Sequence, residues 1–109
     1  MKRSTATLLK KMGVPPHLIG YDYIGEGAEL IHADRRYLRG VTTKLYPAIA
    51  KKFDTTPARV ERGIRHAVET VFNNPLNNEA FEIFGSTIGT KDKPVNSHFL
   101  AVVADLLED

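Results

Sequence analysis

One run of the sequence, residues 59–66, combines the side chains best suited to contacting nucleic acid. Arginine directs paired N–H donors at guanine O6 and N7, and a carboxylate accepts a hydrogen bond from the cytosine amino group. Arg59, Glu61 and Arg62 are therefore candidates for contacts with base edges. Arg65 and His66 follow about one turn later and are candidates for contacts with phosphates. These residue types and their spacing make the run a candidate for binding double-stranded DNA.

An amphipathic helix over about residues 57–72 is expected to carry these side chains. Thr56 suits an N-cap, and Pro57 suits the first helical position, where its missing N–H costs nothing. The apolar side of the helix consists of Val60, Ile64, Ala67, Val68 and Val71. The opposite side is largely cationic, so the helix is expected to bury one face and present the other.

A shorter helix is expected just before this one, over residues 45–53. A turn at Asp54 and Thr55 joins the two, and this order of elements is the plan of a helix-turn-helix. The turn lacks the usual glycine, so Asp54 must adopt its geometry, which aspartate tolerates. Lys51 and Lys52 end the first helix and are predicted to contact phosphate.

The rest of the chain predicts an all-α fold of about six helices in a single domain, residues 1–109, with no β-sheet and no wing. The other helices are expected from a cap at Ser4 or Thr5 to Met12, over 21–33, over 79–84, and from a cap at Asn96 or Ser97 through an apolar face that includes Leu106. Gly20 is expected to end a turn, and Gly25 and Gly27 to weaken the helix that follows. Residues 34–40 are expected to form either a charged connection or a frayed turn, and the next helix either starts or kinks at Pro47.

Composition and charge limit the classes of protein to which this chain can belong. The net charge is only +2, but residues 44–69 carry six cations against three anions, so the basic character is local. The chain has no cysteine, no apolar run of about 20 residues and no secretory signal. We therefore expect a soluble, cytoplasmic protein that does not enter a membrane.

No catalytic or metal-binding pattern is present in the sequence. The four histidines, His17, His32, His66 and His98, lack the spacing of metal ligands. The segment from Gly85 to Lys91 lacks the spacing of a phosphate-binding loop, and no nucleophile–base set stands out. We expect no enzymatic activity, no metal and no cofactor. Lys91 and Lys93 are either further phosphate contacts or solvated loop lysines.

The cationic helix face has a second interpretation. Charged residues on a solvated helix pair at i,i+3 and i,i+4 spacing, as Arg65 could with Glu69, without any ligand. The residue pattern by itself leaves both interpretations open.

Several motifs resemble the C-terminal effector domain of the stage 0 sporulation protein A family, response-regulator transcription factors of spore-forming Firmicutes. The motifs are Tyr46-Pro47, residues 49–53, Thr55-Thr56, residues 59–62 and residues 64–67. Flanking matches, such as Gly13-Val-Pro15 and Lys93-Pro94, extend the resemblance from about Gly13 to Asp105.

The resemblance implies a six-helix fold whose helix-turn-helix binds a promoter box and regulates early sporulation genes. It places base recognition on Arg59, Glu61 and Arg62, and phosphate contact mainly on Arg65 and His66. It also implies contact with the RNA polymerase sigma factor through about residues 74–84, and a dimer on tandem sites. In full-length members a phosphorylated receiver domain dimerises the protein.

This chain departs from the family pattern in four places. No receiver domain is expected within residues 1–109, so the chain is either an excised domain or a free-standing homologue. The glycines at 25 and 27 and the sequence of residues 74–78 also differ from the family pattern, and no basic tail is expected within residues 1–109. Two hypotheses follow: a sequence-specific DNA-binding regulator, or a protein-interaction module that kept the fold and lost specific DNA recognition.

Overall fold

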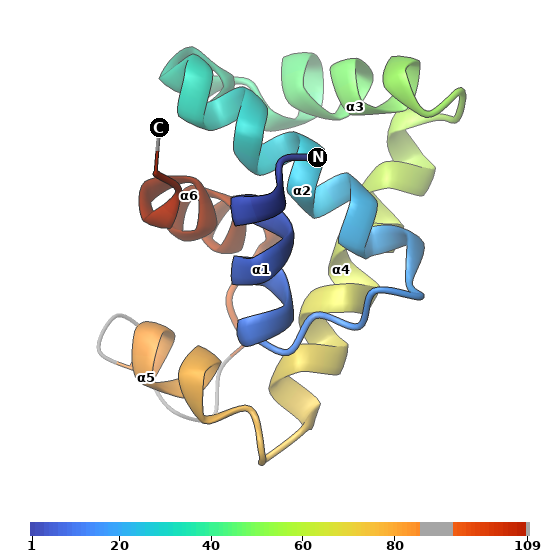
Figure 1. Cartoon of the computed structure of the whole chain (residues 1–109). Helices are drawn as coiled ribbons and strands as arrows, with labels where there is room; N and C mark the ends of the chain where they lie inside the picture. Colours follow the sequence, from blue (N-terminus) through green and yellow to red (C-terminus); the bar gives the residue numbers. More distant parts are fainter. Residues whose placement is uncertain (86–92, 109) are drawn as a thin grey trace.

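The computed structural model describes residues 1–85 and 93–108, and in these ranges it contains six α-helices and no β-strand (Figure 1). The helices are α1 (Arg3–Lys11), α2 (Ile19–Ala33), α3 (Tyr46–Lys52), α4 (Pro57–Asn73), α5 (Asn78–Gly85) and α6 (Asn96–Leu106). A 3₁₀-helix, Arg35–Arg39, and a π-helical turn, Val41–Leu45, connect α2 to α3. The all-α prediction is confirmed.

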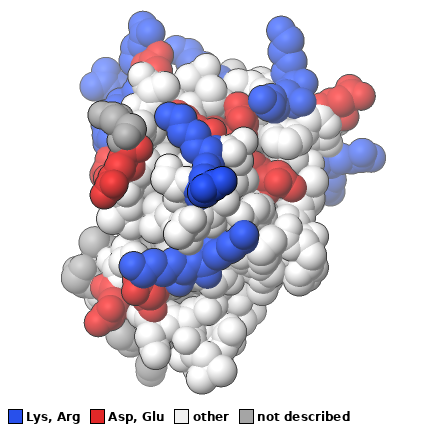
Figure 2. All heavy atoms as spheres, in the orientation of Figure 1, with Lys and Arg blue, Asp and Glu red and all other residues white. Residues whose placement is uncertain are grey.

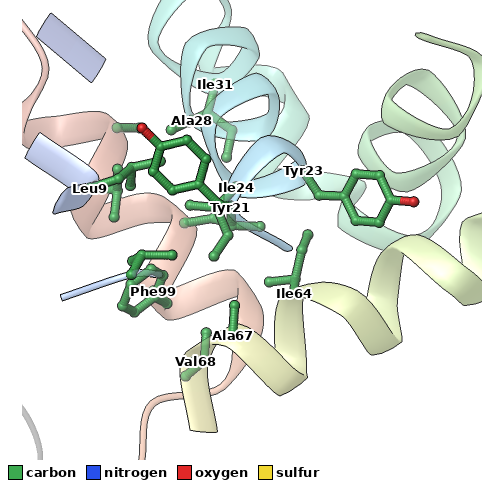
Figure 3. Packing of buried hydrophobic residues seen from close by; sticks show 14 of the residues in the cluster. Leu9, Tyr21, Tyr23, Ile24, Ala28, Ile31, Ile64, Ala67, Val68 and Phe99 are labelled. Atoms are coloured by element: carbon green, nitrogen blue, oxygen red, sulfur yellow. The ribbon is translucent and has the colours of Figure 1, made fainter. Parts of the chain in front are cut away.

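The hydrophobic core is centred on α2, which packs against both α4 and α6. Figure 3 shows Ile24 of α2, Ile64 of α4 and Phe99 of α6 in one cluster, and all three side chains are fully buried. Burying each such side chain contributes about 1.5–3 kcal/mol relative to exposure. The core therefore fixes α4 through its apolar side.

The backbones of α2 and α4 approach closely at a pair of glycines. A Cβ on Gly20 would overlap the carbonyl oxygen of Gly63 and lie 2.8 Å from Cβ of Ala67. A Cβ on Gly63 would lie 2.9 Å from the ring of Tyr23. The prediction that Gly20 ends a turn is wrong: it lies in the first turn of α2, where only glycine leaves room for α4.

The second helix, predicted over residues 21–33, is present and starts two residues earlier than predicted, at Ile19. α2 continues without a break from Ile19 to Ala33, and both Gly25 and Gly27 are buried within it. A Cβ on Gly27 would lie 3.1 Å from Ile49 and 3.3 Å from Leu100. Each glycine costs about 1 kcal/mol of helix propensity. Close packing against α3 and α6 offsets that cost.

The predicted side-chain caps of the first and last helices are wrong. The expected capping residues were Ser4 or Thr5, and Asn96 or Ser97. α1 instead follows Lys2, and α6 follows Val95, and neither of these two residues caps its helix with a side-chain hydrogen bond. Thr5 is buried in α1, and Asn96 directs its amide toward α3 and α4. Burial and tertiary hydrogen bonds outweigh the local capping preference at both positions.

The connection between α2 and α3 is more regular than predicted. The carboxylate of Asp34 accepts a hydrogen bond from the backbone N–H of Arg36 at 3.0 Å, which caps the 3₁₀-helix. Hydrogen bonds from the Arg36 side chain and backbone hold the pKa of Asp34 below its ordinary value. The π-helical turn then runs directly into α3, so Pro47 lies in the first turn of that helix, where proline is tolerated.

Aromatic packing joins α5 to the rest of the domain. Phe72 of α4 makes edge contacts with Phe81 and Phe84 of α5, at ring-centroid distances of 5.6 and 5.4 Å. Phe84 also stacks on Phe99 of α6 at 5.3 Å.

Leu106, expected on the apolar face of α6, is instead 43% exposed at the end of that helix. None of the helices in the described ranges has the length and apolar character needed to cross a bilayer.

Candidate nucleic-acid interface

The helix-turn-helix is formed by α3, α4 and the turn between them. Asp54 has a φ of +52°, the left-handed conformation that the sequence required of it. The backbone N–H of Thr55 donates to the carbonyl oxygen of Ala50 at 2.9 Å and closes the end of α3. Phe53 packs edge-on against Tyr23 of α2, with ring centroids 5.5 Å apart. The predicted turn is confirmed, and it is anchored to the core.

The start of α4 also follows the prediction. The Oγ1 of Thr56 accepts a hydrogen bond from the backbone N–H of Arg59 at 3.2 Å, and Pro57 occupies the first turn. Such a cap stabilises a helix by about 1 kcal/mol. Because the cap defines where α4 begins, it also places Arg59 and Arg62 in the first two turns.

The apolar side of α4 is buried as predicted. Its members are Val60, Ile64, Ala67, Val68 and Val71, each no more than 2% exposed. This burial turns the opposite side of the helix toward solvent. Arg59, Arg62, Arg65 and His66 are all exposed, and Glu61 is half-buried at the flank. Four of the five residues predicted on α4 are therefore accessible to a large ligand without any change in the fold.

Glu61 and Arg65 form an ion pair on the flank of α4. The Nη1 of Arg65 lies 2.8 Å from the Oε1 of Glu61, at i,i+4 spacing. The alternative interpretation of the sequence paired Arg65 with Glu69, whereas the structure pairs it with Glu61. An exposed pair of this kind contributes only about 0.3–0.5 kcal/mol. Exchanging it for contacts with DNA therefore costs little.

Further cations of the helix-turn-helix lie beside its turn. Lys51 and Lys52 are exposed in the last turn of α3, beside the turn. Figure 2 shows cationic side chains projecting from the upper right of the molecule, where α3 and the start of α4 lie in Figure 1. Other cationic side chains and interspersed acidic ones lie across the rest of the same view, so this face does not carry a single cationic patch.

Lys93 is placed close to the predicted phosphate contacts of α4. It is exposed, and it lines the same surface hollow as Arg65. Glu61 and Glu69 line that hollow too, so its charges are balanced. Lys91 lies outside the described residues. Lys93 and Arg65 thus line one surface hollow, while Lys51 and Lys52 lie on α3.

One contact in this region was missed by sequence reasoning. The Nδ2 of Asn96 donates to the carbonyl oxygen of Glu61 at 3.0 Å and to the hydroxyl of Tyr46 at 3.1 Å. Burial raises the pKa of Tyr46, and the nearby charge of Glu61 adds to that shift, which outweighs the opposing hydrogen bond from Asn96. No local pattern links residues so far apart in the chain, and the sequence signal at Asn96 was that of a cap.

The described residues offer no cluster of three or more His, Cys, Asp or Glu side chains that could hold a metal ion. The helix-turn-helix exposes the cationic face of α4 after a short helix and a tight turn. This geometry is suited to contacts with phosphates and base edges.

Comparison with known proteins agrees with this geometry. Residues 5–107 match the family model described as "Sporulation initiation factor Spo0A C terminal", which covers nearly the whole chain. That family consists of DNA-binding regulatory domains and is not a known family of enzymes. The chain therefore belongs to the family of C-terminal, DNA-binding effector domains of the sporulation initiation factor Spo0A.

Proposed function

We propose that residues 1–109 form a single effector domain that recognises a specific promoter box by placing α4 in the major groove of duplex DNA. The observation that carries this proposal is the two-sided character of α4: a fully buried apolar stripe opposite exposed arginines in the first two turns. The major groove is about 12 Å wide and accepts an α-helix. The alternative, a protein-interaction module, requires no such placement of arginines.

Recognition of bases is assigned to Arg59, Glu61 and Arg62. Both arginines are exposed, so each can direct its guanidinium at a guanine. Glu61 accepts from Arg65 in the free protein and would release it to accept from a cytosine amino group. A good contact of this kind discriminates against the wrong base by about 1–3 kcal/mol.

Register on the DNA is assigned to phosphate contacts. The residues are Lys51, Lys52, Arg65, His66, Lys91 and Lys93. Lys51 and Lys52 come from the first helix of the motif, and Arg65 and His66 from the middle of α4, so they would hold the backbone on both sides of the inserted helix. A DNA-binding domain of this kind acts in the bacterial cytoplasm, where the chromosome lies.

Two variants separate the base contacts from the phosphate contacts. Arg62→Ala should lower affinity by about 1–3 kcal/mol and relax preference at one base pair. Arg65→Ala should weaken binding to all sequences alike and flatten the slope of log K against log salt by about one. The test is to measure affinities for a set of singly substituted duplexes at several salt concentrations. These affinities distinguish a base contact from a phosphate contact. A uniform loss for both variants would contradict the assignment.

We also infer that residues 74–84 contact the RNA polymerase sigma factor. Leu76 in this segment is 82% exposed. The segment is ordered around it, because Asn74 accepts from the Leu76 backbone N–H at 3.0 Å and Asn77 donates to the Val71 carbonyl oxygen at 2.8 Å. Leu76→Asp should therefore abolish regulated transcription in vitro while leaving DNA affinity unchanged. Loss of both activities, or of neither, would refute the inference.

We also propose that two copies of the domain dimerise on tandem sites. Binding to adjacent boxes should then be cooperative, so that the second copy binds its box more tightly than one copy binds an isolated box. A titration of duplexes carrying one box, two boxes, and two boxes separated by an extra half turn of DNA tests this. Equal affinity per box on all three duplexes would show that the domains bind independently.

A further inference from the structure

We propose that Asn96 is a positioning residue for base recognition, whose side-chain amide fixes the orientation of α4 relative to α3 and α6. The inference rests on the proposed function, because it concerns how accurately α4 presents Arg59 and Arg62. Asn96 itself is half-buried in the first turn of α6 and is not assigned any contact with DNA.

The geometry of the amide is defined by its two partners. The carbonyl oxygen of Glu61 is purely an acceptor, so the amide nitrogen of Asn96, and not its oxygen, must face it at 3.0 Å. The second N–H of the same nitrogen points to the hydroxyl oxygen of Tyr46 at 3.1 Å. One primary amide thereby uses both of its donors to join three helices.

The two acceptors of the Asn96 amide lie on the two helices of the helix-turn-helix. Glu61 belongs to the turn of α4 that also carries Arg59 and Arg62, so a hydrogen bond to its carbonyl oxygen restrains the position of that turn. Tyr46 is the first residue of α3 and is only 6% exposed, which fixes its hydroxyl within the body of the domain. The amide therefore ties the base-contacting turn to the first helix of the motif.

Apolar packing alone does not provide this restraint. The buried stripe of α4 faces the core, whereas Glu61 lies at the flank of that stripe. Hydrophobic contacts are non-directional and tolerate a small roll of the helix, while a hydrogen bond weakens steeply as its angle departs from linear. Binding groups generally have to be held within about 0.5 Å and 10–20° of the productive geometry. Asn96 supplies a directional restraint at the position where a roll would displace the arginines.

The test compares Asn96→Ala and Asn96→Asp with the wild-type chain and with Ser97→Ala, an exposed neighbour in the same turn. Asn96→Asp is the sharper variant, because a carboxylate cannot donate to the Glu61 carbonyl oxygen. It should nevertheless preserve α6, since an acidic residue in the first turn interacts favourably with the helix dipole. Circular dichroism and thermal unfolding establish that each variant is folded at the temperature of the binding assay.

The readout is the ratio of affinities for the box and for a scrambled duplex of the same length. We expect both Asn96 variants to lower this ratio at least about fivefold, the weaker limit for losing one bidentate base contact. The salt dependence of binding to the scrambled duplex should not change for Asn96→Ala, because no phosphate contact is removed. Ser97→Ala should keep the wild-type ratio. A purely structural role would lower the unfolding temperature and leave the ratio intact.

The outcomes separate this inference from the proposed function. If the wild-type chain discriminates and both folded Asn96 variants keep its ratio within twofold, the inference is wrong and the proposed function stands. If the wild-type chain does not discriminate between the two duplexes, the proposed function fails and the inference falls with it.

Discussion

The close crossing of α2 and α4 makes Gly20→Ala the most informative perturbation of the fold. The added Cβ would overlap the backbone carbonyl oxygen of Gly63 and lie 2.8 Å from Cβ of Ala67. Neither group is the end of a flexible side chain, so the two helices must separate. Overpacking of this kind typically costs about 1–3 kcal/mol.

The size of the effect follows from two opposing terms. Alanine is favoured over glycine by at most about 1 kcal/mol inside a helix. The benefit is smaller at Gly20, which lies in the first turn of α2. We therefore expect Gly20→Ala to lower the free energy of unfolding by about 2 kcal/mol. For a domain of this size, that loss lowers the unfolding temperature by roughly 5–12 °C.

Gly85→Ala is the matched control. A Cβ at Gly85 would meet no atom within 4 Å, so this substitution should leave stability unchanged or raise it slightly. Urea unfolding followed by circular dichroism gives the free energy of unfolding of both variants. If Gly20→Ala proves as harmless as Gly85→Ala, the two helices do not meet at Gly20 and Gly63, and the account of how α4 is seated is wrong.

Three further predictions concern the helix-turn-helix and its supports. Thr56→Ala removes the cap of α4 and should cost about 1 kcal/mol in thermal unfolding; an unchanged unfolding temperature would show that the cap contributes nothing. Asp54→Ala should cost about 1–2 kcal/mol because of the positive φ, whereas Asp54→Gly should not; equal losses would show that backbone conformation is not the cause. Burial raises the pKa of Tyr46. The neutral phenol therefore stabilises the fold below pH about 10, and this contribution is lost as the pH rises through the pKa that Tyr46 has in the folded protein. Urea midpoints between pH 8 and 11 should fall less for Tyr46→Phe than for the wild-type chain, and parallel curves would contradict this.

The parts of the fold that follow from local chemistry were predictable from the sequence. Thr56, Pro57 and the apolar stripe define α4 by themselves, because capping and helical periodicity are properties of neighbouring residues. Asp54 could be assigned the left-handed turn because few other residue types tolerate it. The exposure of Arg59 and Arg62 then follows from the burial of the opposite side.

The parts that depend on distant partners were not predictable. From its neighbours in the sequence, Gly20 resembles a turn residue. Its close contact with Gly63 is visible only in the structure, because no local sequence pattern indicates it. Asn96 has the residue type of a helix cap, but the carbonyl oxygen of Glu61 and the hydroxyl of Tyr46 compete successfully for its amide. Arg65 had two acidic neighbours on α4, and only the structure shows that it pairs with Glu61.

The central claim, that α4 recognises bases, is tested most directly by titrating the wild-type chain with the promoter box and with a scrambled duplex. Three base-contacting side chains, each contributing about 1–3 kcal/mol of discrimination, predict a preference for the box of at least about 100-fold. The preference should persist as salt is raised, while the affinity for both duplexes falls steeply. Equal affinity for the two duplexes, or no binding to either, would contradict the account.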